Sequence, residues 1–163
     1  MTVYWITYSF LVFLAFTSKT RKQKPNGFFR KNFNLLTLYF FFFFVLFIGF
    51  RFDVGGDWNQ YLVMYLRVND FSSSGFILGD PAFNFLNLIS SQLGIGFHGS
   101  NIICAGIFMY GLLKFCRYLP RPNLALLVAF PYLIIIVGMG YQRQSVAIGL
   151  SMLATLALFE RRI

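Results

Sequence analysis

Five apolar runs dominate the pattern of hydrophobic and polar positions along the chain. A helix that crosses the ~30 Å hydrocarbon core of a bilayer needs about 20 apolar residues, and flanking aromatic, Lys and Arg side chains extend each run to roughly 17–20. The pattern predicts an all-α, polytopic transmembrane helix bundle of about five spans, in one integral membrane domain over 1–163. The predicted spans are 2–17, 33–50, 100–117, 122–139 and 143–160.

The composition favours lipid as the solvent of this chain. Of its 163 residues, 58% are hydrophobic and 12% are charged, whereas a soluble domain carries about 25% charged residues. The formal net charge of +9 would suit nucleic acid in a soluble protein. Here the basic residues lie between the apolar runs, so they report membrane topology, and no nucleic-acid partner is expected.

The positions of the basic residues predict the orientation of the chain. The segment Thr17–Asn32 holds six basic residues and no acidic one, which places it in the cytoplasm. The N-terminus is then extracytoplasmic, the C-terminus is cytoplasmic, and eleven of the fourteen Lys and Arg residues lie inside. The extracytoplasmic side receives the other three basic residues and all four aspartates, which are Arg51, Arg67, Arg143, Asp53, Asp57, Asp70 and Asp80.

This orientation requires that the segment 81–96 does not cross the membrane. Asp80 and Pro81 predict a helix start, with a capping carboxylate and a proline in the first turn. Asn84, Asn87 and Ser91 then form a polar stripe. A helix of ~13–15 residues reaches only about 20 Å, so it is expected to lie at the interface or to re-enter. The extracytoplasmic loop 51–99 therefore contains one or two interfacial helices.

The first part of this loop carries a second helical pattern. Gly55 and Gly56 predict a turn, and Asp57 is placed to cap the helix that follows. Its aromatic and apolar side chains recur at helical spacing, at Trp58, Tyr61, Tyr65 and Val68. Such a stripe suits the lipid headgroup layer, and stacking on a sugar is the other interpretation.

Arg51 and Arg143 are the candidate ligand-binding residues. Both are expected at helix ends on the side where membrane insertion disfavours arginine, which suggests an anionic partner. Two such arginines could hold a diphosphate through bidentate hydrogen bonds. Snorkelling, or a structural ion pair with Asp53 or Asp57, is the alternative.

Other polar residues of the same side add weaker candidates. Gln142 and Gln144 flank Arg143 and could contact a sugar. His98 is either an interfacial histidine without a role or a site residue. Cys104 and Cys116 are twelve positions apart on one predicted helix, so they are expected to be packing residues. No metal-binding or nucleotide-binding spacing occurs, and no cofactor is expected, although a divalent ion at the aspartates stays open.

Three segments resemble the EpsG family of bacterial exopolysaccharide proteins, which is similar to the Wzy O-antigen polymerases. Residues 50–61 (FRFDVGGDWNQY) resemble its R-x-x-V-G-x-D-Y-x-x-Y signature, residues 80–87 (DPAFNFLN) its E-P-G-F-x-x-L-N segment, and residues 140–149 (GYQRQSVAIG) its R-Q-x-x-A helix start. Trp58 stands where the family has Tyr, and Asp80 where it has Glu. The chain resembles only the N-terminal half of a full-length member.

The resemblance implies a membrane glycosyltransferase of the bacterial cytoplasmic membrane, a polymerase of exopolysaccharide or O-antigen biosynthesis. Such an enzyme joins oligosaccharide repeat units carried on polyprenyl diphosphate, so Arg51 and Arg143 would bind the diphosphate and Asp57 or Asp53 would be the catalytic base. Trp58, Tyr61, Gln142, Gln144 and His98 would contact sugar. The implied partners are lipid-linked oligosaccharide, membrane lipid, other polysaccharide assembly proteins and a missing C-terminal half.

Two other hypotheses stay open. The chain could be a non-catalytic membrane subunit or a truncated remnant of a polysaccharide assembly system. A small transporter would need charged or broken helices at the membrane midplane, and the five predicted spans show no such charge.

Overall fold

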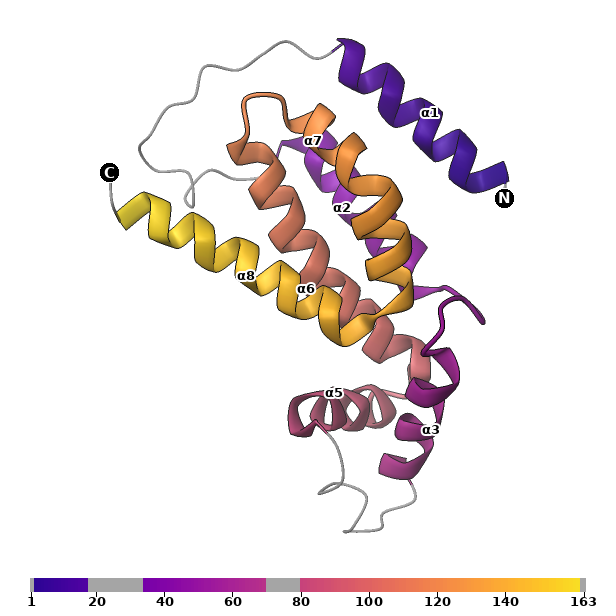
Figure 1. Ribbon diagram of the computed structural model, residues 1–163. Helices are drawn as coiled ribbons and strands as arrows, with labels where there is room; N and C mark the ends of the chain where they lie inside the picture. Colours follow the sequence, from indigo (N-terminus) through magenta and orange to yellow (C-terminus); the bar gives the residue numbers. More distant parts are fainter. Residues whose placement is uncertain (1, 18–33, 70–79, 162–163) are drawn as a thin grey trace.

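The chain folds into helices, as the sequence predicts. The structure, a computed structural model, describes residues 2–17, 34–69 and 80–161, and that part of the chain contains no strand. Figure 1 shows the arrangement. The helices are α1 (Thr2–Thr17), α2 (Leu35–Gly49), α3 (Trp58–Asn69), α5 (Pro81–Gln92), α6 (Phe97–Tyr118), α7 (Pro122–Ala129), the π-helix η1 (Phe130–Gly138) and α8 (Gln142–Arg161).

Helix α6 lies at the centre of the bundle. It packs against α2, α5, α7 and α8, while α1 packs against α7 (Figure 1). Large side chains of its main core come from α2, α6 and η1: Phe44, Phe108 and Phe130 are at most 1% exposed. A second, smaller cluster joins α3 and α5 to the first turns of α6, through Trp58 and Tyr61 among others.

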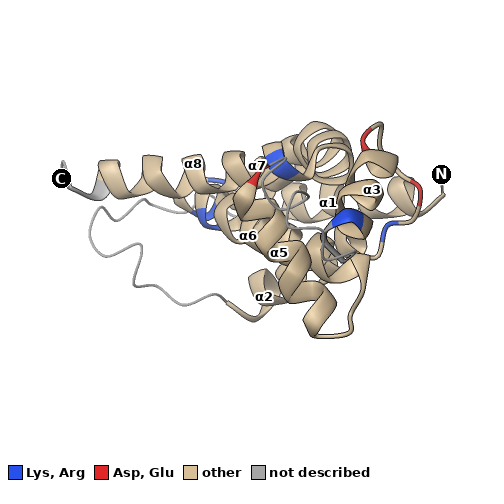
Figure 2. Cartoon of the chain, turned by 90° about the horizontal axis from the view of Figure 1, so that it is seen from below, with Lys and Arg blue, Asp and Glu red and all other residues tan. Residues whose placement is uncertain are grey.

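The two ends of the bundle carry different charges. Asp53, Asp57 and Asp80 lie in or beside the loops around α3 and α5, and we call this end the aspartate end. Figure 2 draws all its red segments in this region. The opposite end, which we call the basic end, is defined by Lys114, Arg117 and Arg121 at the α6–α7 connection.

Contacts of α1 and α8 show which end of each helix lies at the aspartate end and which at the basic end. The Tyr4 hydroxyl lies 3.8 Å from the Met139 sulfur near the aspartate end, and the Asn123 amide donates to the Leu14 carbonyl at 3.3 Å near the basic end. The rings of Tyr118 and Phe159 stack at 6.1 Å, also at the basic end. The described ends of α1 and α8 therefore lie at the same two ends of the bundle, and their sides of a membrane stay a prediction.

A helix lies in each of the five predicted spans, but the lengths differ. Among the described residues, only α6 is both long and apolar enough to cross a membrane. Helices α1 and α2 and the segment Pro122–Gly138 are apolar and shorter. Five crossings therefore stay a prediction. The basic segment 18–33 and Asp70 lie outside the described residues.

Helix α5 begins at Pro81, as predicted, but one detail of the prediction is wrong. The Asp80 side chain makes no capping hydrogen bond; its carboxylate has another partner, described below. The polar stripe of Asn84, Asn87 and Ser91 faces protein at its first two residues, which are at most 3% exposed, while Ser91 is partly buried and Phe85 is 56% exposed. In lipid this orientation is the favourable one, because buried polar groups face inward and apolar groups face out.

Two backbone features set how the helices meet. Pro131 has no N–H to donate within η1, and the nine residues of η1 form a π-helix, with hydrogen bonds from residue i to i+5. Gly111 of α6 and Gly149 of α8 allow a close crossing: a Cβ atom at Gly111 would clash with the Gly149 carbonyl. Small residues at such crossings let membrane helices approach closely.

Candidate functional site at the aspartate end

Arg51 lies directly after α2 and is buried, with 5% of its surface exposed. Its Nη1 donates to the Gly138 carbonyl at 3.4 Å, and its guanidinium lies 5.9 Å from the centre of the Trp58 ring. Nε and Nη2 are buried and have no hydrogen-bond partner in the described part of the protein. The guanidinium group therefore keeps two unsatisfied donors.

The surroundings of Arg51 leave it charged. Burial lowers the pKa of Arg51 to about 10, while nearby Tyr61, Cys104 and Asp57 oppose this shift. At neutral pH the group is still protonated. Its positive charge is thus held in a weakly solvated position, where interactions with an anion are stronger than in water.

At Gly55 the loop that carries Arg51 packs closely against the turn that precedes α8. Its backbone has φ +105°, in the left-handed region that favours glycine. A Cβ atom there would lie 2.7 Å from the Met139 carbonyl oxygen and 2.8 Å from the Gly140 Cα. The loop from α2 and the turn before α8 are therefore in direct backbone contact.

Arg143 lies in the first turn of α8 and forms an ion pair with Asp80, with Nη1 and Oδ2 2.5 Å apart. The two side chains are 39% and 56% exposed. The guanidinium also lies 5.6 Å from the centre of the Tyr61 ring. The alternative from the sequence, an ion pair with Asp53 or Asp57, is wrong for Arg143: α5 begins beside the start of α8, so Asp80 is the carboxylate within reach.

Helix α3 brings the two arginines to one region. Trp58 and Tyr61 are three positions apart and so lie on one face of α3, with Arg51 over the first ring and Arg143 over the second. Arg143 and Asp80 also line a pocket of about 290 Å³ between α5, α6 and α8, with Phe83 and Cys104 in its wall.

The aromatic stripe of α3 is part of the interior. Trp58 and Tyr61 are 7% and 2% exposed. The Trp58 ring meets Phe97 edge to face at 4.9 Å, and the Tyr61 ring lies 5.2 Å from Phe83. The prediction that this stripe faces lipid headgroups is wrong for these two residues, because α5 and α6 cover it. The same burial leaves neither ring face open to a sugar.

The remaining candidates lie in different surroundings. Gln142 is buried and its amide donates to the Asn101 side chain, whereas Gln144 is exposed. His98 lies beside the Trp58 ring, with Nδ1 3.4 Å from the Gly49 carbonyl. Asp53 is exposed and has φ +49°.

Asp57 directly precedes α3, and its carbonyl accepts the Tyr61 backbone N–H at 3.1 Å. Asp57 is half-buried and lies close enough to Arg51 to act on its pKa. Residues 2–17, 34–69 and 80–159 contain no group of three His, Cys, Asp or Glu side chains that could hold a metal ion.

Sequence reasoning missed three polar residues of this end. Asp80 was assigned to helix capping, although its place in a family-like motif was a signal for a further role. Asn101 was assigned to the start of an apolar run, and Asn87 to the polar stripe of an interfacial helix. Asn87 is fully buried, and both of its side-chain polar atoms lack a partner among the described residues.

The fold and this site define the class of the protein. The described part of the chain is helical, exposes many apolar side chains and has a central helix of membrane-spanning length. At one end it carries Arg51 over the Trp58 ring and Arg143 over the Tyr61 ring. The EpsG family matches residues 34–163, and the chain therefore belongs to that family. It is an exopolysaccharide-related membrane protein. No curated protein and no solved structure matches it.

Proposed function

We propose that this chain is a membrane-embedded polymerase of exopolysaccharide or O-antigen biosynthesis. It joins oligosaccharide repeat units carried on polyprenyl diphosphate at the outer face of the bacterial cytoplasmic membrane. Membership of the EpsG family supports the pathway. The observation that carries the proposal is the buried, incompletely hydrogen-bonded Arg51 in the same region as Arg143.

A buried cation without a bonded carboxylate is costly, because desolvation is not repaid by an opposite charge. Within the described residues Arg51 forms no salt bridge, and its best hydrogen bond is a long one to a carbonyl. An anion at this place would offset that cost and satisfy the two remaining donors. A diphosphate has oxygens enough to engage Arg51 and Arg143 together.

The arrangement supports glycosyl transfer with a diphosphate leaving group. A hydroxyl of the acceptor sugar attacks the anomeric carbon of the donor saccharide, and the bond between that carbon and the diphosphate oxygen breaks. Polyprenyl diphosphate leaves with the electron pair, and the acceptor proton passes to a carboxylate. The two guanidinium groups stabilise the charge that develops on the leaving oxygen.

Asp57 suits the base better than Asp53 does. It lies near Arg51 just before α3, whereas Asp53 is exposed. Asp80 is already held by Arg143. We therefore expect Asp57 to be the base. Once substrate is bound, its carboxylate takes the proton of the acceptor hydroxyl across a hydrogen bond.

The proposed binding of one diphosphate by both arginines, which we call the clamp, is tested by Arg51→Gln and Arg143→Gln. Each variant is tested in protein shown to be folded and inserted. Arg67→Gln is the matched control, since Arg67 is an exposed arginine at the end of α3. We expect shorter polymer for both test variants and unchanged polymer for the control. Unchanged polymer in both test variants would overturn the clamp.

Purified chain given a lipid-linked repeat unit separates catalysis from the non-catalytic alternative. Chain elongation by the wild type, lost in Asp57→Asn, supports the enzyme. The comparison is a complete polysaccharide system that elongates polymer in the same membrane. If the wild-type chain alone elongates no polymer there, the result would favour the non-catalytic subunit.

Sidedness is tested by single cysteines in a background that lacks Cys104 and Cys116. Asp70→Cys should react with an impermeant maleimide in intact cells, and Gly27→Cys only after permeabilisation. The reverse pattern would place the arginines on the wrong side for an extracytoplasmic donor.

A further inference from the structure

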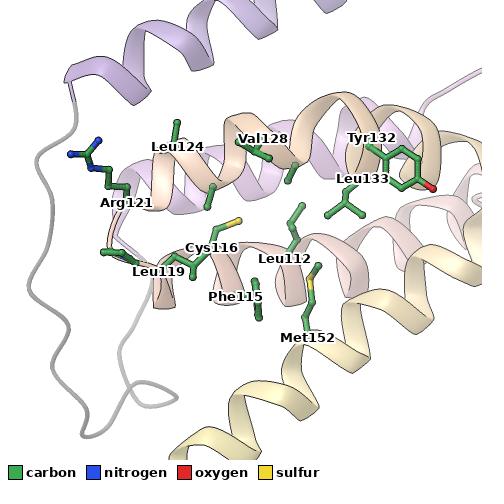
Figure 3. Close-up of a pocket in the computed structure, with 13 residues that line it drawn as sticks. Leu112, Phe115, Cys116, Leu119, Arg121, Leu124, Val128, Tyr132, Leu133 and Met152 are labelled. Atoms are coloured by element: carbon green, nitrogen blue, oxygen red, sulfur yellow. The ribbon is translucent and has the colours of Figure 1, made fainter.

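A long apolar groove opens near the basic end, away from the arginine site. It measures about 740 Å³ and lies between α6 and the α7–η1 segment, with Met152 of α8 at one side (Figure 3). Leu112 and Cys116 form its buried floor, and Val128 and Tyr132, 70% and 62% exposed, form its rim.

We propose that this groove binds one acyl chain of an anionic phospholipid whose phosphate is held by Arg121. Arg121 is the one charged residue among the described groove-lining residues. Figure 3 shows it at one end of the groove with its guanidinium directed outward. The apolar lining suits a hydrocarbon chain, and Arg121 at the end of the groove suits the phosphate of the same lipid.

The charge of the basic end favours an anionic headgroup. Lys114 and Arg117 lie in the last turns of α6, just before Arg121. All three described aspartates lie at the opposite end of the bundle. Each Lys or Arg near an anionic membrane surface adds favourable free energy, while a zwitterionic lipid gains little.

The size of the groove favours a lipid chain over a protein helix. An 18-residue helix about 10 Å across and about 27 Å long fills roughly 2,100 Å³, about three times the groove volume of about 740 Å³. Pockets for small ligands hold about 300–1,000 Å³. The polyprenyl chain is a poorer candidate, because its diphosphate is proposed at the other end of the bundle.

Fluorescence quenching by brominated lipids tests the proposal on the full chain. The reporter is Tyr132→Trp, a conservative change on the groove rim, in a background of Trp5→Phe and Trp58→Phe. Vesicles contain phosphatidylglycerol and phosphatidylcholine in fixed ratio, with bromine on the acyl chains of one lipid at a time. Val128→Trp is the second reporter if the first variant does not fold.

We expect brominated phosphatidylglycerol to quench the reporter more than brominated phosphatidylcholine does. Arg121→Gln should reduce the preference about fivefold, the effect of one basic group at an anionic surface, and Arg67→Gln should not. Ala125→Phe, which fills the groove, should reduce quenching by both lipids. Ala154→Phe, on an exposed part of α8, is its control.

Equal quenching by the two lipids, unchanged in Arg121→Gln, would overturn the anionic site. Weak quenching in a folded reporter, unaffected by Ala125→Phe, would show that protein covers the groove. Relief of quenching by polyprenyl phosphate but not by added phosphatidylglycerol would assign the groove to the carrier lipid. None of these results depends on polymerase activity, so the proposed function can fail or hold independently.

Discussion

Replacing Gly55 by alanine is the sharpest perturbation of the candidate site. Gly55 joins the Arg51 loop to the turn before α8, and its φ of +105° is unfavourable for alanine. Such a backbone conformation costs about 1–3 kcal/mol in a residue with a side chain. The new Cβ would also lie 2.7 Å from the Met139 carbonyl oxygen.

Because the three atoms nearest to this Cβ all belong to the backbone, no side-chain rotation relieves the overlap. Real Cβ contacts begin at 3.0 Å, so the loop must move away by at least about 0.3 Å, the difference between 3.0 and 2.7 Å. The movement would lengthen the Arg51–Gly138 hydrogen bond, which is 3.4 Å already. We expect shorter polymer together with the loss of stability.

Gly56→Ala is the matched control, since a Cβ at Gly56 meets nothing within 4 Å. Both variants stiffen the unfolded chain by a similar amount, worth about 0.4–1 kcal/mol, so their difference isolates the folded state. In detergent-micelle unfolding, Gly55→Ala should be less stable than Gly56→Ala by about 1–3 kcal/mol. In a Trp5→Phe background, the Trp58 emission should shift to the red in Gly55→Ala only.

Equal stability of the two variants, within about 0.5 kcal/mol, together with unchanged Trp58 emission would refute this reasoning. It would mean that the Arg51 loop does not depend on its contact with the turn before α8.

Three further changes test other parts of the structure. Gly111→Ala should destabilise the protein by about 1–3 kcal/mol, because the new Cβ forces α6 and α8 apart. A Cβ at Gly106 meets nothing within 4 Å, so Gly106→Ala should stabilise the protein by about 0.5–1 kcal/mol. Chemical denaturation measures both free energies of unfolding. Arg51→Leu should leave the unfolding free energy unchanged or raise it by about 1–4 kcal/mol while polymer is lost, and a large drop in thermal stability would show a structural role instead. Asp80→Asn should change stability by less than about 1 kcal/mol, because its ion pair with Arg143 is largely exposed; double-mutant cycles with Arg143→Gln would expose a larger coupling.

Most helices were predictable because apolar runs mark them directly. The run that ends at Phe50 gives α2, and the Asp80–Pro81 pair fixes the start of α5. The π-helix was not predictable, since Pro131 alone indicates a disturbed helix without giving the type of disturbance. Periodicity likewise finds the stripe on α3 but does not say whether lipid or α5 covers it.

The candidate site shows the same division. The two arginines were found because the predicted topology places them on the side where insertion disfavours arginine, and the fold brings both over α3. Their partners depend on which loop ends meet in space. Asp80 and Arg143 are 63 positions apart, and no local pattern in the sequence joins them.

The π-helix η1 has a consequence for how this region can vary. An α-helix turns about 100° per residue, so removing one residue from η1 to restore ordinary winding would rotate everything after it by about that angle around the helix axis. The Gly138 carbonyl would then turn away from Arg51, and α8 would leave from a different direction. The extra residue thus fixes the direction in which α8 continues, and its deletion would change that direction as well as shorten the helix.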